Sequence, residues 1–246
     1  MSQQQEHFNF APIGHIESCY PDKFGVPRQP GLAPSSTAKL KISREYQPEQ
    51  ALDGLERFSH VWLIFIFHKN SNARYHAKVH PPRLNGESIG LFATRSPHRP
   101  NPIGLSLVEL DKVEGDTVYF RGIDLVDGTP ILDLKPYIPE IEAKPGAIDG
   151  WTSDVIKESE RAIEVIFSPE QLDFLSSWAL RINQPTLKGL IEETLKLDPR
   201  PLVYRGFEGN REPPYRSQHA VRFFDGDVHF EFVNSHQIKI LQIKLD

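Results

Sequence analysis

The sequence predicts a mainly β protein: an antiparallel sheet, open or closed into a small barrel, followed by a smaller α+β unit. Short apolar or alternating segments recur up to about residue 136 with turn residues between them, which is typical of antiparallel strands. No segment in this part is long enough for a helix that crosses between parallel strands. Beyond Lys144-Pro145-Gly146 the pattern becomes helical. We therefore expect one domain at residues 1–145 and a second at 146–246.

The composition is that of an ordinary globular protein, with 246 residues, 39% of them hydrophobic and 25% charged. The longest apolar run, at 60–67, is too short to cross a bilayer, and the first residues lack the basic and apolar regions of a secretion signal. The single cysteine, Cys19, excludes an internal disulfide and fits a reducing compartment. We expect a cytoplasmic protein without membrane contact, in which Cys19 serves packing rather than catalysis.

The first third of the chain combines strand patterns with one proline-rich loop. The run at 60–67 is apolar on both faces and rich in aromatic and β-branched residues, which favours a buried central strand. Pro48 suits the first position of a helix, because that position needs no N–H donor. We expect these elements in order: a strand at 8–18, a loop at 20–34, a strand at 39–44, a short helix at 48–56 and a strand at 60–67.

The stretch from Phe92 to Leu110 has a polar half and an alternating half. From Ile103 the residues alternate as in a strand, and three prolines prevent the strand from beginning earlier. The prolines also stiffen the polar half, so its donors are held in place before a ligand arrives. Either this is a rigid solvated turn, or it binds an anion or a nucleic acid, and we favour the second reading. The donors are Arg95, Ser96, His98, Arg99 and Asn101.

Local charge between residues 68 and 99 contrasts with the net charge of −5. A cationic zone on an acidic protein can steer an anionic partner to that zone, although a merely solvated basic face is the alternative. His68, at the end of the predicted 60–67 strand, is either a satisfied strand-end histidine or part of a site. The zone sets six basic side chains against one acid: Lys69, Arg74, Lys78, Arg83, Arg95 and Arg99 against Glu87.

Residues 116–125 alternate as a strand and are expected to pair with 103–113 across a turn at Glu114-Gly115. Asp127-Gly128 is a further strong turn sequence. Three carboxylates surround it, and in the simplest interpretation Asp127 only caps its own turn. These carboxylates are Asp124, Asp127 and Asp133.

The C-terminal part predicts two helices and a hairpin. Ser168 followed by Pro169 and Gln171 is a capping-box sequence, and inward residues are expected at 172, 175, 178, 179 and 182. A second helix is expected from about Pro185 to the break at 198–201. Its inward residues are Leu187, Leu190, Ile191, Leu195 and Leu197. A hairpin around Asp225-Gly226 and a last strand at 238–245 follow.

Several well-known motifs are missing from the sequence. It has no G-x-x-x-x-G-K-[ST], no G-x-G-x-x-G and no G-x-S-x-G, so a P-loop, a dinucleotide-binding Rossmann fold and a nucleophile elbow are not supported. The pair His76 and His80 has no partner for a zinc site, so we expect no metal. The residues alone indicate a cytosolic, two-part, β-rich anion binder, with RNA as one candidate for the anion.

Four motifs resemble the tRNA (adenine-N6)-methyltransferase family known as TrmO, YaeB-like or TsaA-like. Shorter matches at 58–62, 67–68 and 83–84 extend the resemblance over essentially the whole chain, and it is weakest at 143–197. The motifs are Val26-Pro-Arg-Gln-Pro-Gly31, Ala93-Thr-Arg-Ser-x-x-Arg-Pro-Asn-Pro-Ile-Gly104, Asp124-Leu-Val-Asp-Gly-Thr-Pro130 and Asp198-Pro-Arg-Pro201.

The resemblance implies an S-adenosylmethionine-dependent enzyme that methylates N6 of threonylcarbamoyl-adenosine at position 37 of threonine tRNA. It also implies a small β-barrel domain unlike the Rossmann-type methyltransferases, a homodimer, and a C-terminal domain that helps to hold the tRNA anticodon stem-loop. A non-catalytic protein that binds RNA or a small ligand on the same barrel is the alternative.

The resemblance also implies site residues. The nitrogen that attacks the methyl group must lose a proton, and Asp127, His68 or water is expected to accept it. Arg95 or Arg99 is expected to bind the threonyl carboxylate. Phe92 is either a stacking platform or, as we expect, a core residue. Residues expected to bind the methyl donor are Pro30, Gly31, Leu32, His68, Lys69, Arg95, Leu105, Asp127, Gly128, Thr129 and Pro130. Those expected to be catalytic are Asp127, His68 and Arg95, and those expected to bind the substrate are Arg99, Asn101, Arg28 and Arg200.

Overall fold

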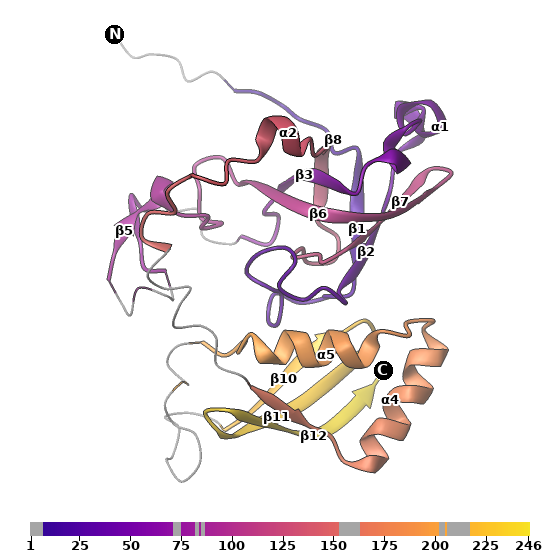
Figure 1. The fold of residues 1–246 in the computed structure, drawn as a ribbon, viewed down its shortest axis with the longest axis vertical. Coiled ribbons are helices and arrows are strands. Elements are labelled where there is room, and N and C mark those ends of the chain that lie inside the picture. The colour runs from indigo at the N-terminus through magenta and orange to yellow at the C-terminus, as the bar shows by residue number, and fades with distance from the viewer. Residues whose placement is uncertain are drawn as a thin grey trace.

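The computed structural model describes residues 7–70, 75–81, 84, 87–152, 163–201, 205 and 217–246. These residues form a closed six-stranded barrel and, next to it, a four-stranded sheet covered by two helices (Figure 1). The barrel lies in the upper part of Figure 1 and the C-terminal unit below it. This arrangement confirms the mainly β fold with a smaller α+β C-terminal unit.

The barrel is antiparallel throughout, and pairing of β8 with β1 closes it. Closure leaves no unpaired strand edge, so the open-sheet alternative is excluded. In barrel order the strands are β1 (Gly14–Ser18), β2 (Thr37–Lys41), β7 (Thr117–Arg121), β6 (Ile103–Glu114), β3 (His60–Ile66) and β8 (Pro130–Pro136).

Two predicted elements are shorter than expected. The strand expected at 8–18 begins at Gly14, after Pro12, which has no N–H to donate to a neighbouring strand. The helix expected at 48–56 does begin at Pro48 but ends at Ala51, because Gly54 adopts a left-handed φ of +83°. The connecting segments hold η1 (Arg44–Tyr46), α1 (Pro48–Ala51), η2 (Leu55–Arg57), β4 (Lys78–Val79), β5 (Ile89–Gly90), η4 (Leu91–Ala93) and α2 (Pro139–Glu142).

Strand β6 has the predicted start and alternation. Its inner face is buried, whereas Leu105 on the outer face is 53% exposed. Gly104 lies opposite Phe65 on β3, and a Cβ there would come within 2.2 Å of the Phe65 ring. The residues on the inner face are Gly104, Ser106, Val108 and Leu110.

The expectation that β3 is buried on both faces is wrong. Only Val61, Leu63 and Phe65 are fully buried, and the intervening side chains are half-buried on the outside. Trp62 is covered there by segments that follow β8, since its Nε1 donates to Glu142 Oε1 at 2.9 Å and its ring packs edge-on against Tyr137. Apolar residues on both faces of a strand therefore also suit a barrel wall whose outer side is partly covered.

The C-terminal sheet has the order β10-β11-β12-β9. Strand β9 pairs in parallel with β12 and was missed from the sequence, because three residues are too few for a recognisable alternation. The capping box at Ser168 and Gln171 is confirmed. Leu172, however, is exposed rather than inward. The elements are β9 (Glu164–Ile166), α4 (Pro169–Arg181), α5 (Leu187–Lys196), β10 (Gln218–Phe223), β11 (Gly226–Asn234) and β12 (Gln237–Leu245).

The two units share one hydrophobic core. The Tyr20 hydroxyl and the Thr194 hydroxyl lie 3.1 Å apart, and the Tyr20 ring packs against Phe223. Burial raises the pKa of the neighbouring Cys19 to about 12, which confirms its packing role. Such contacts hold the units in a fixed relation, although we keep residue 145 as the proposed boundary in the chain.

In the parts of the chain that the structure describes, no helix combines the length and the apolar character that a bilayer-spanning helix needs.

Candidate functional site

Loops from separate parts of the chain meet at one end of the barrel. The Pro30-Gly31-Leu32 segment lies on the exit of β7, where Gly31 N–H donates to the Gly122 carbonyl at 2.8 Å. Both glycines have left-handed φ values, and a Cβ on Gly122 would lie 3.2 Å from Gly31 Cα. Glycine at both positions therefore permits this close contact between the two loops.

The proline-rich loop after Phe92 is tied to the same place. Arg95 donates from one guanidinium nitrogen to Gln29 Oε1 at 2.6 Å, which joins it to the segment just before Pro30. Asn70 Nδ2 donates to the Pro97 carbonyl at 2.7 Å, and Arg99 donates to the Thr94 carbonyl at 2.9 Å. Arg95 and Arg99, two of the predicted donors of this loop, are thus fixed within the fold.

The Asp127-Gly128 turn is fixed by contacts with β1. Asp127 Oδ1 accepts from Ser18 N–H at 2.8 Å, and the N–H groups of Asp127 and Gly128 donate to Tyr20 and Ile16 carbonyls. The interpretation that Asp127 merely caps its own turn is therefore wrong, because its carboxylate joins segments 109 residues apart. Thr129 and Pro130 continue from this turn into β8.

His68 lies across from this turn. A Cβ on Gly128 would lie 4.0 Å from His68 Nε2. Burial lowers the pKa of His68, and the neighbouring Lys69 ammonium lowers it further. The imidazole is therefore neutral at neutral pH and able to accept a proton. Lys69 itself donates to the Pro21 carbonyl at 2.8 Å, so the basic pair is anchored to the β1–β2 loop.

Asp124 is a buried carboxyl group to which the sequence analysis gave no role. Among the residues that the structure describes, its Oδ1 has no hydrogen-bond partner. Burial raises its pKa to about 6, against the opposing effects of the Ser106 hydroxyl and the Arg95 charge. Unsatisfied buried carboxyl groups are costly and concentrate at functional sites. The sequence revealed only that an acid follows β7.

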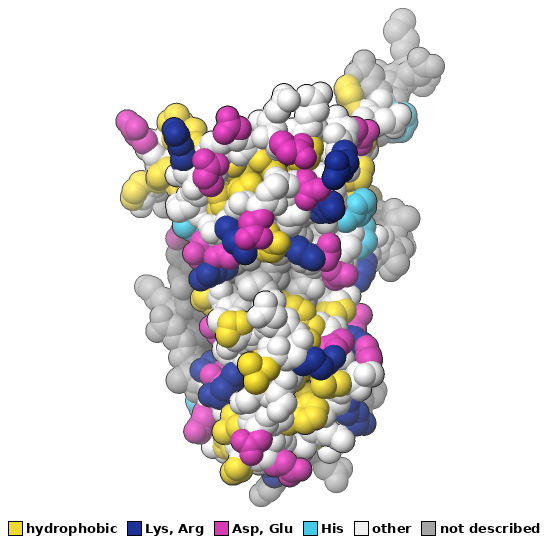
Figure 2. Space-filling view, turned by 90° about the vertical axis from the view of Figure 1, so that its right-hand side faces the viewer, with side chains coloured by type: hydrophobic (Ala, Val, Ile, Leu, Met, Phe, Trp, Pro, Cys, Tyr) yellow, Lys and Arg dark blue, Asp and Glu magenta, His cyan; other side chains and the backbone are white. Residues whose placement is uncertain are grey.

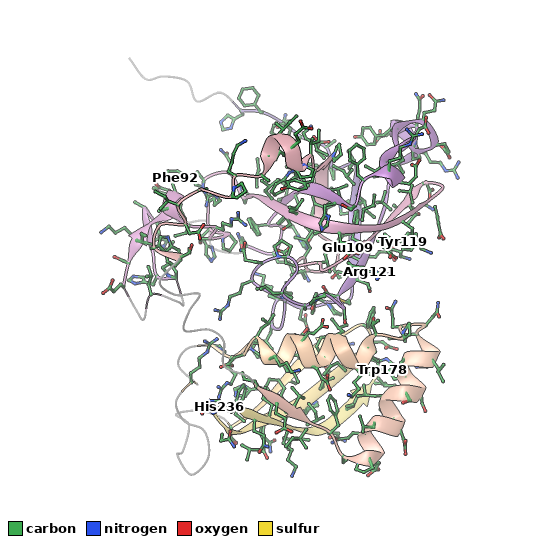
Figure 3. All side chains as sticks on the ribbon, viewed as in Figure 1. Phe92, Glu109, Tyr119, Arg121, Trp178 and His236 are labelled. Atoms are coloured by element: carbon green, nitrogen blue, oxygen red, sulfur yellow. The ribbon has the colours of Figure 1, made fainter. Side chains whose placement is uncertain are left out.

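Phe92 is exposed, so the expectation that it belongs to the core is wrong. Its side chain is 72% exposed, and the Arg99 guanidinium carbon lies 5.6 Å from the ring centroid. Figure 3 shows Phe92 on the side of the barrel occupied by β5, away from Tyr119 and Arg121. Trp151 joins this region by donating to the Ala93 carbonyl at 2.8 Å. A role of Phe92 in stacking stays a prediction.

Other predicted residues lie elsewhere. Arg200 is in the C-terminal unit, with a side chain only 5% exposed that binds Asp198 and stacks on Phe232 at 3.3 Å. This geometry favours a structural role for Arg200. Asp133 is on β8 and pairs with Lys135, and Arg28 lines a cavity between the two units. Asn101 is exposed beside the proline-rich loop. Arg74 and Arg83, part of the predicted basic zone, lie outside the described residues.

Charge on another face of the molecule is mixed. Figure 2 shows the right-hand side of Figure 1, where basic and acidic side chains are interspersed. Exposed barrel ion pairs such as Lys39–Glu17 at 2.8 Å illustrate this local neutralisation. Within the described ranges, no group of three His, Cys, Asp or Glu residues is arranged to hold a metal ion.

Comparison with known proteins gives the same family in both halves of the chain. The family model described as "tRNA-methyltransferase O N-terminal domain" matches residues 15–143, and the "TrmO C-terminal domain" matches residues 160–246. A solved structure titled as TrmO from Pseudomonas aeruginosa superposes with a TM-score of 0.79 at 35% identity, and the match covers 100% of both chains.

Curated relatives agree with these matches. The chain is 41% identical over 230 residues to the Escherichia coli protein named tRNA (adenine(37)-N6)-methyltransferase, covering 91% of this chain and 96% of that one. A Pseudomonas aeruginosa protein named "Putative S-adenosylmethionine-dependent methyltransferase RcsF" is 40% identical over 95% of this chain and 96% of its own length. A mouse protein with the same name as the E. coli one is 58% identical over 134 residues, 54% of this chain. The match spans only 31% of the mouse protein's length.

Proposed function

Since the chain belongs to the TrmO family of tRNA methyltransferases, we propose that it transfers a methyl group from S-adenosylmethionine to N6 of adenosine 37 in tRNA. The observation that carries this proposal is the convergence of segments that are distant in the sequence at one barrel end. Arg95 reaches Gln29 beside Pro30, and His68 lies across from Gly128.

The residues at this end of the barrel fit S-adenosylmethionine. The Arg95 guanidinium suits its carboxylate, and the exposed Leu32 and Leu105 side chains suit its purine ring. A Cβ on Gly31 would meet no described atom within 4 Å, so the backbone is open to close approach by a ligand. Asp127, fixed on the Ser18 N–H, places a negative charge near the site, which suits a cationic ligand.

When bound, S-adenosylmethionine supplies the methyl group as an electrophile on a positively charged sulfur. The protein has to hold the acceptor nitrogen in line with this methyl group, and such positioning is worth about 7–11 kcal/mol. Loops stiffened by prolines and fixed by the Asn70–Pro97 and Asp127–Ser18 hydrogen bonds supply this rigidity. Of the predicted proton acceptors, His68 is better suited than Asp127, because its imidazole is neutral and the Asp127 carboxylate already accepts a hydrogen bond.

We propose that the acceptor is the threonylcarbamoyl form of adenosine 37 in threonine tRNA, and that Arg99 binds the threonyl carboxylate. The bond of Arg99 to the Thr94 carbonyl uses one of the five N–H donors of its guanidinium group. The same bond holds the group beside the exposed Phe92 ring. A planar guanidinium can bind a carboxylate through two parallel hydrogen bonds, which a lysine cannot do.

The substitution Arg99→Lys tests this assignment. We expect the ratio of kcat/KM for modified over unmodified tRNA to fall about tenfold, since a charge-assisted hydrogen bond is worth about 1.5–3 kcal/mol. Arg57→Lys, on η2, is the matched control and should leave the ratio unchanged. Equal ratios for Arg99→Lys and the unaltered protein would remove Arg99 from carboxylate recognition.

We propose that the anticodon stem-loop lies against the 68–99 segment, with an unstacked base on Phe92. Proteins recognise loop bases in RNA by stacking and edge contacts, and the exposed Phe92 ring offers such a surface. The described cations of this segment supply attraction to phosphates. Binding should therefore weaken steeply as the salt concentration rises.

We further propose that the enzyme is a cytoplasmic homodimer. Support for the dimer comes from the outer face of β6, where Ile103 and Leu105 are exposed next to the site. The single buried Cys19 fits a reducing compartment. Sedimentation velocity at micromolar concentration measures the oligomeric state, and Ile103→Glu, on the same exposed face of β6, should shift a dimer toward monomer.

Calorimetric titration with S-adenosylmethionine, followed by transfer of a radiolabelled methyl group to bulk tRNA, tests the main proposal. We expect binding and transfer, and loss of both in Arg95→Ala. Arg57→Ala is the matched control, because Arg57 is exposed on η2 before the start of β3, whereas the site lies beyond the other end of that strand, where His68 follows it. Donor binding without transfer to any tRNA would favour the alternative, a non-catalytic binding protein on the same barrel.

A further inference from the structure

A cavity of about 280 Å³ lies between the two units, next to the site described above, with which it shares Leu32. One wall comes from the β1–β2 loop, with Phe24, Pro27 and Leu32. The other wall comes from the end of α5 and the residues after it, with Thr194, Leu197 and Pro199. The volume is just below the usual range for ligand sites, and the lining combines apolar side chains with charged and polar ones.

The walls of this cavity are fixed by contacts on both sides. Gly25 packs on Val221 so closely that a Cβ would come within 2.4 Å of the Val221 side chain. The Thr194 hydroxyl contacts the Tyr20 hydroxyl, and the Lys23 ammonium donates to the Lys69 carbonyl. The cavity is therefore largely preformed, and a ligand entering it would order little of the protein.

The charge around the cavity is positive. Lys23 and Arg28 lie on the wall formed by the β1–β2 loop, and Asp198 is the acid on the opposite wall. The Asp198 carboxylate is paired with the guanidinium groups of Arg200 and Arg205, at 2.9 and 3.3 Å. Among the described residues that line the cavity, Lys23 and Arg28 outnumber Asp198, the one acid, and the Asp198 carboxylate is already paired, so this lining favours an anionic ligand in a protein whose overall charge is −5.

We propose that this cavity binds a second, unstacked nucleotide of the tRNA substrate, with its base between the apolar walls and its phosphate toward Lys23 and Arg28. This inference rests on the proposed function and extends it to a nucleotide other than the methylated one. Apolar walls suit the face of a base, and cations suit the phosphate. Leu32 and the Lys23–Lys69 contact connect the cavity to the methyl-transfer site, so both sites can engage one RNA chain.

The same cavity depends on the fixed relation between the C-terminal unit and the barrel. Neither unit alone forms the cavity, since Pro27 and Arg28 come from one and Leu197 and Pro199 from the other. A nucleotide bound there would contact both units at once. The C-terminal unit thus contributes to tRNA binding at a defined place, next to the β1–β2 loop.

Two substitutions in the full-length protein test the proposal. Leu197→Trp fills the cavity, and Leu180→Trp, at a position 83% exposed on α4, is its matched control. Arg28→Ala removes a cation from the wall, and Lys188→Ala, on the exposed side of α5, is its matched control. Filter binding of unfractionated tRNA, KM and kcat with the same tRNA, and calorimetric binding of S-adenosylmethionine are measured for each.

We expect Leu197→Trp and Arg28→Ala each to weaken tRNA binding and raise KM about tenfold, with donor affinity and thermal midpoint unchanged. Arg28→Ala should also reduce the slope of log binding constant against log salt concentration by about one, the effect of one lost phosphate contact. The two controls should match the unaltered protein.

Unchanged tRNA binding and salt dependence in both cavity variants would overturn the proposal. Weaker binding of S-adenosylmethionine with unchanged tRNA binding would also overturn it, because the cavity would then belong to the donor site. If the unaltered protein binds tRNA but transfers no methyl group, the proposed function fails, whereas the filter-binding comparison still decides whether the cavity holds a nucleotide.

Discussion

Replacing Asp124 with asparagine should stabilise the protein, and by an amount that depends on pH. The pKa of Asp124 is raised from its ordinary value of 3.8 to about 6, chiefly by burial. The folded state therefore holds the proton more tightly than the unfolded state does. Between these two pKa values the stability of the protein falls as the pH rises, and above about pH 6 the full cost is present.

The size of the effect follows from that shift. Two pKa units correspond to about 3 kcal/mol, which is the cost of the ionised Asp124 carboxylate at pH 8. At pH 4.5 about 1 kcal/mol of this cost remains, because the unfolded carboxyl group is already mostly ionised there. Asp124→Asn removes the titrating group, so its gain in stability should be larger at pH 8 than at pH 4.5 by about 2 kcal/mol.

Urea unfolding at the two pH values measures this difference. Asp53→Asn, at an exposed position after α1, is the matched control. A gain in stability that does not change with pH, or a loss at pH 8, would show that the buried Asp124 carboxylate carries no desolvation cost.

Arg95 is the charged group that opposes this cost, so Arg95→Ala should enlarge the gain from Asp124→Asn in a double-mutant cycle.

Three further results are expected. Gly104→Ala should destabilise the barrel by about 1–3 kcal/mol in urea unfolding, because its Cβ would overlap the Phe65 ring, and an unchanged midpoint would contradict this. Phe92→Ala should weaken tRNA binding by about 1–3 kcal/mol without altering donor affinity, whereas equal tRNA binding would exclude stacking on this ring. The pKa of His68 is lowered, so the kcat of the unaltered enzyme should fall only at pH values below the ordinary histidine range, where His68 becomes protonated. His68→Gln should lower kcat at least about a hundredfold and abolish this decrease of kcat toward acid pH (the acid limb). If His68→Gln retains the acid limb, another group accepts the proton.

Local sequence patterns predicted many of the secondary-structure elements. The alternation from Ile103 and the proline before it placed β6, and the capping box at Ser168 placed the start of α4. These features depend on backbone angles and on neighbours a few residues away, so the chain carries them in its local order. The recognisable motifs around Arg95, Asp127 and Gly31 likewise indicated the family.

Burial was harder to predict, because it depends on what the rest of the chain brings against a residue. Phe92, on η4, was expected in the core and is 72% exposed, because the described residues around it leave most of its ring uncovered. Arg200 was expected to bind the substrate, and no sequence pattern indicated that its side chain is buried against Asp198 and Phe232. Asp124 gave no sequence signal of its unsatisfied oxygen, because the segments that enclose it are distant in the chain.

The sequence by itself predicted most of the barrel strands, the turn at Asp127-Gly128, the start of α4 and the family to which this protein belongs. Only the tertiary structure decided which face of each strand lies inside the barrel and which distant residues meet. The hydrogen bonds Ser18–Asp127 and Gln29–Arg95 span 109 and 66 residues of chain. Closing such long loops costs conformational entropy, and the packing of the barrel and of the shared core as a whole offsets this cost. No local sequence pattern encodes that packing.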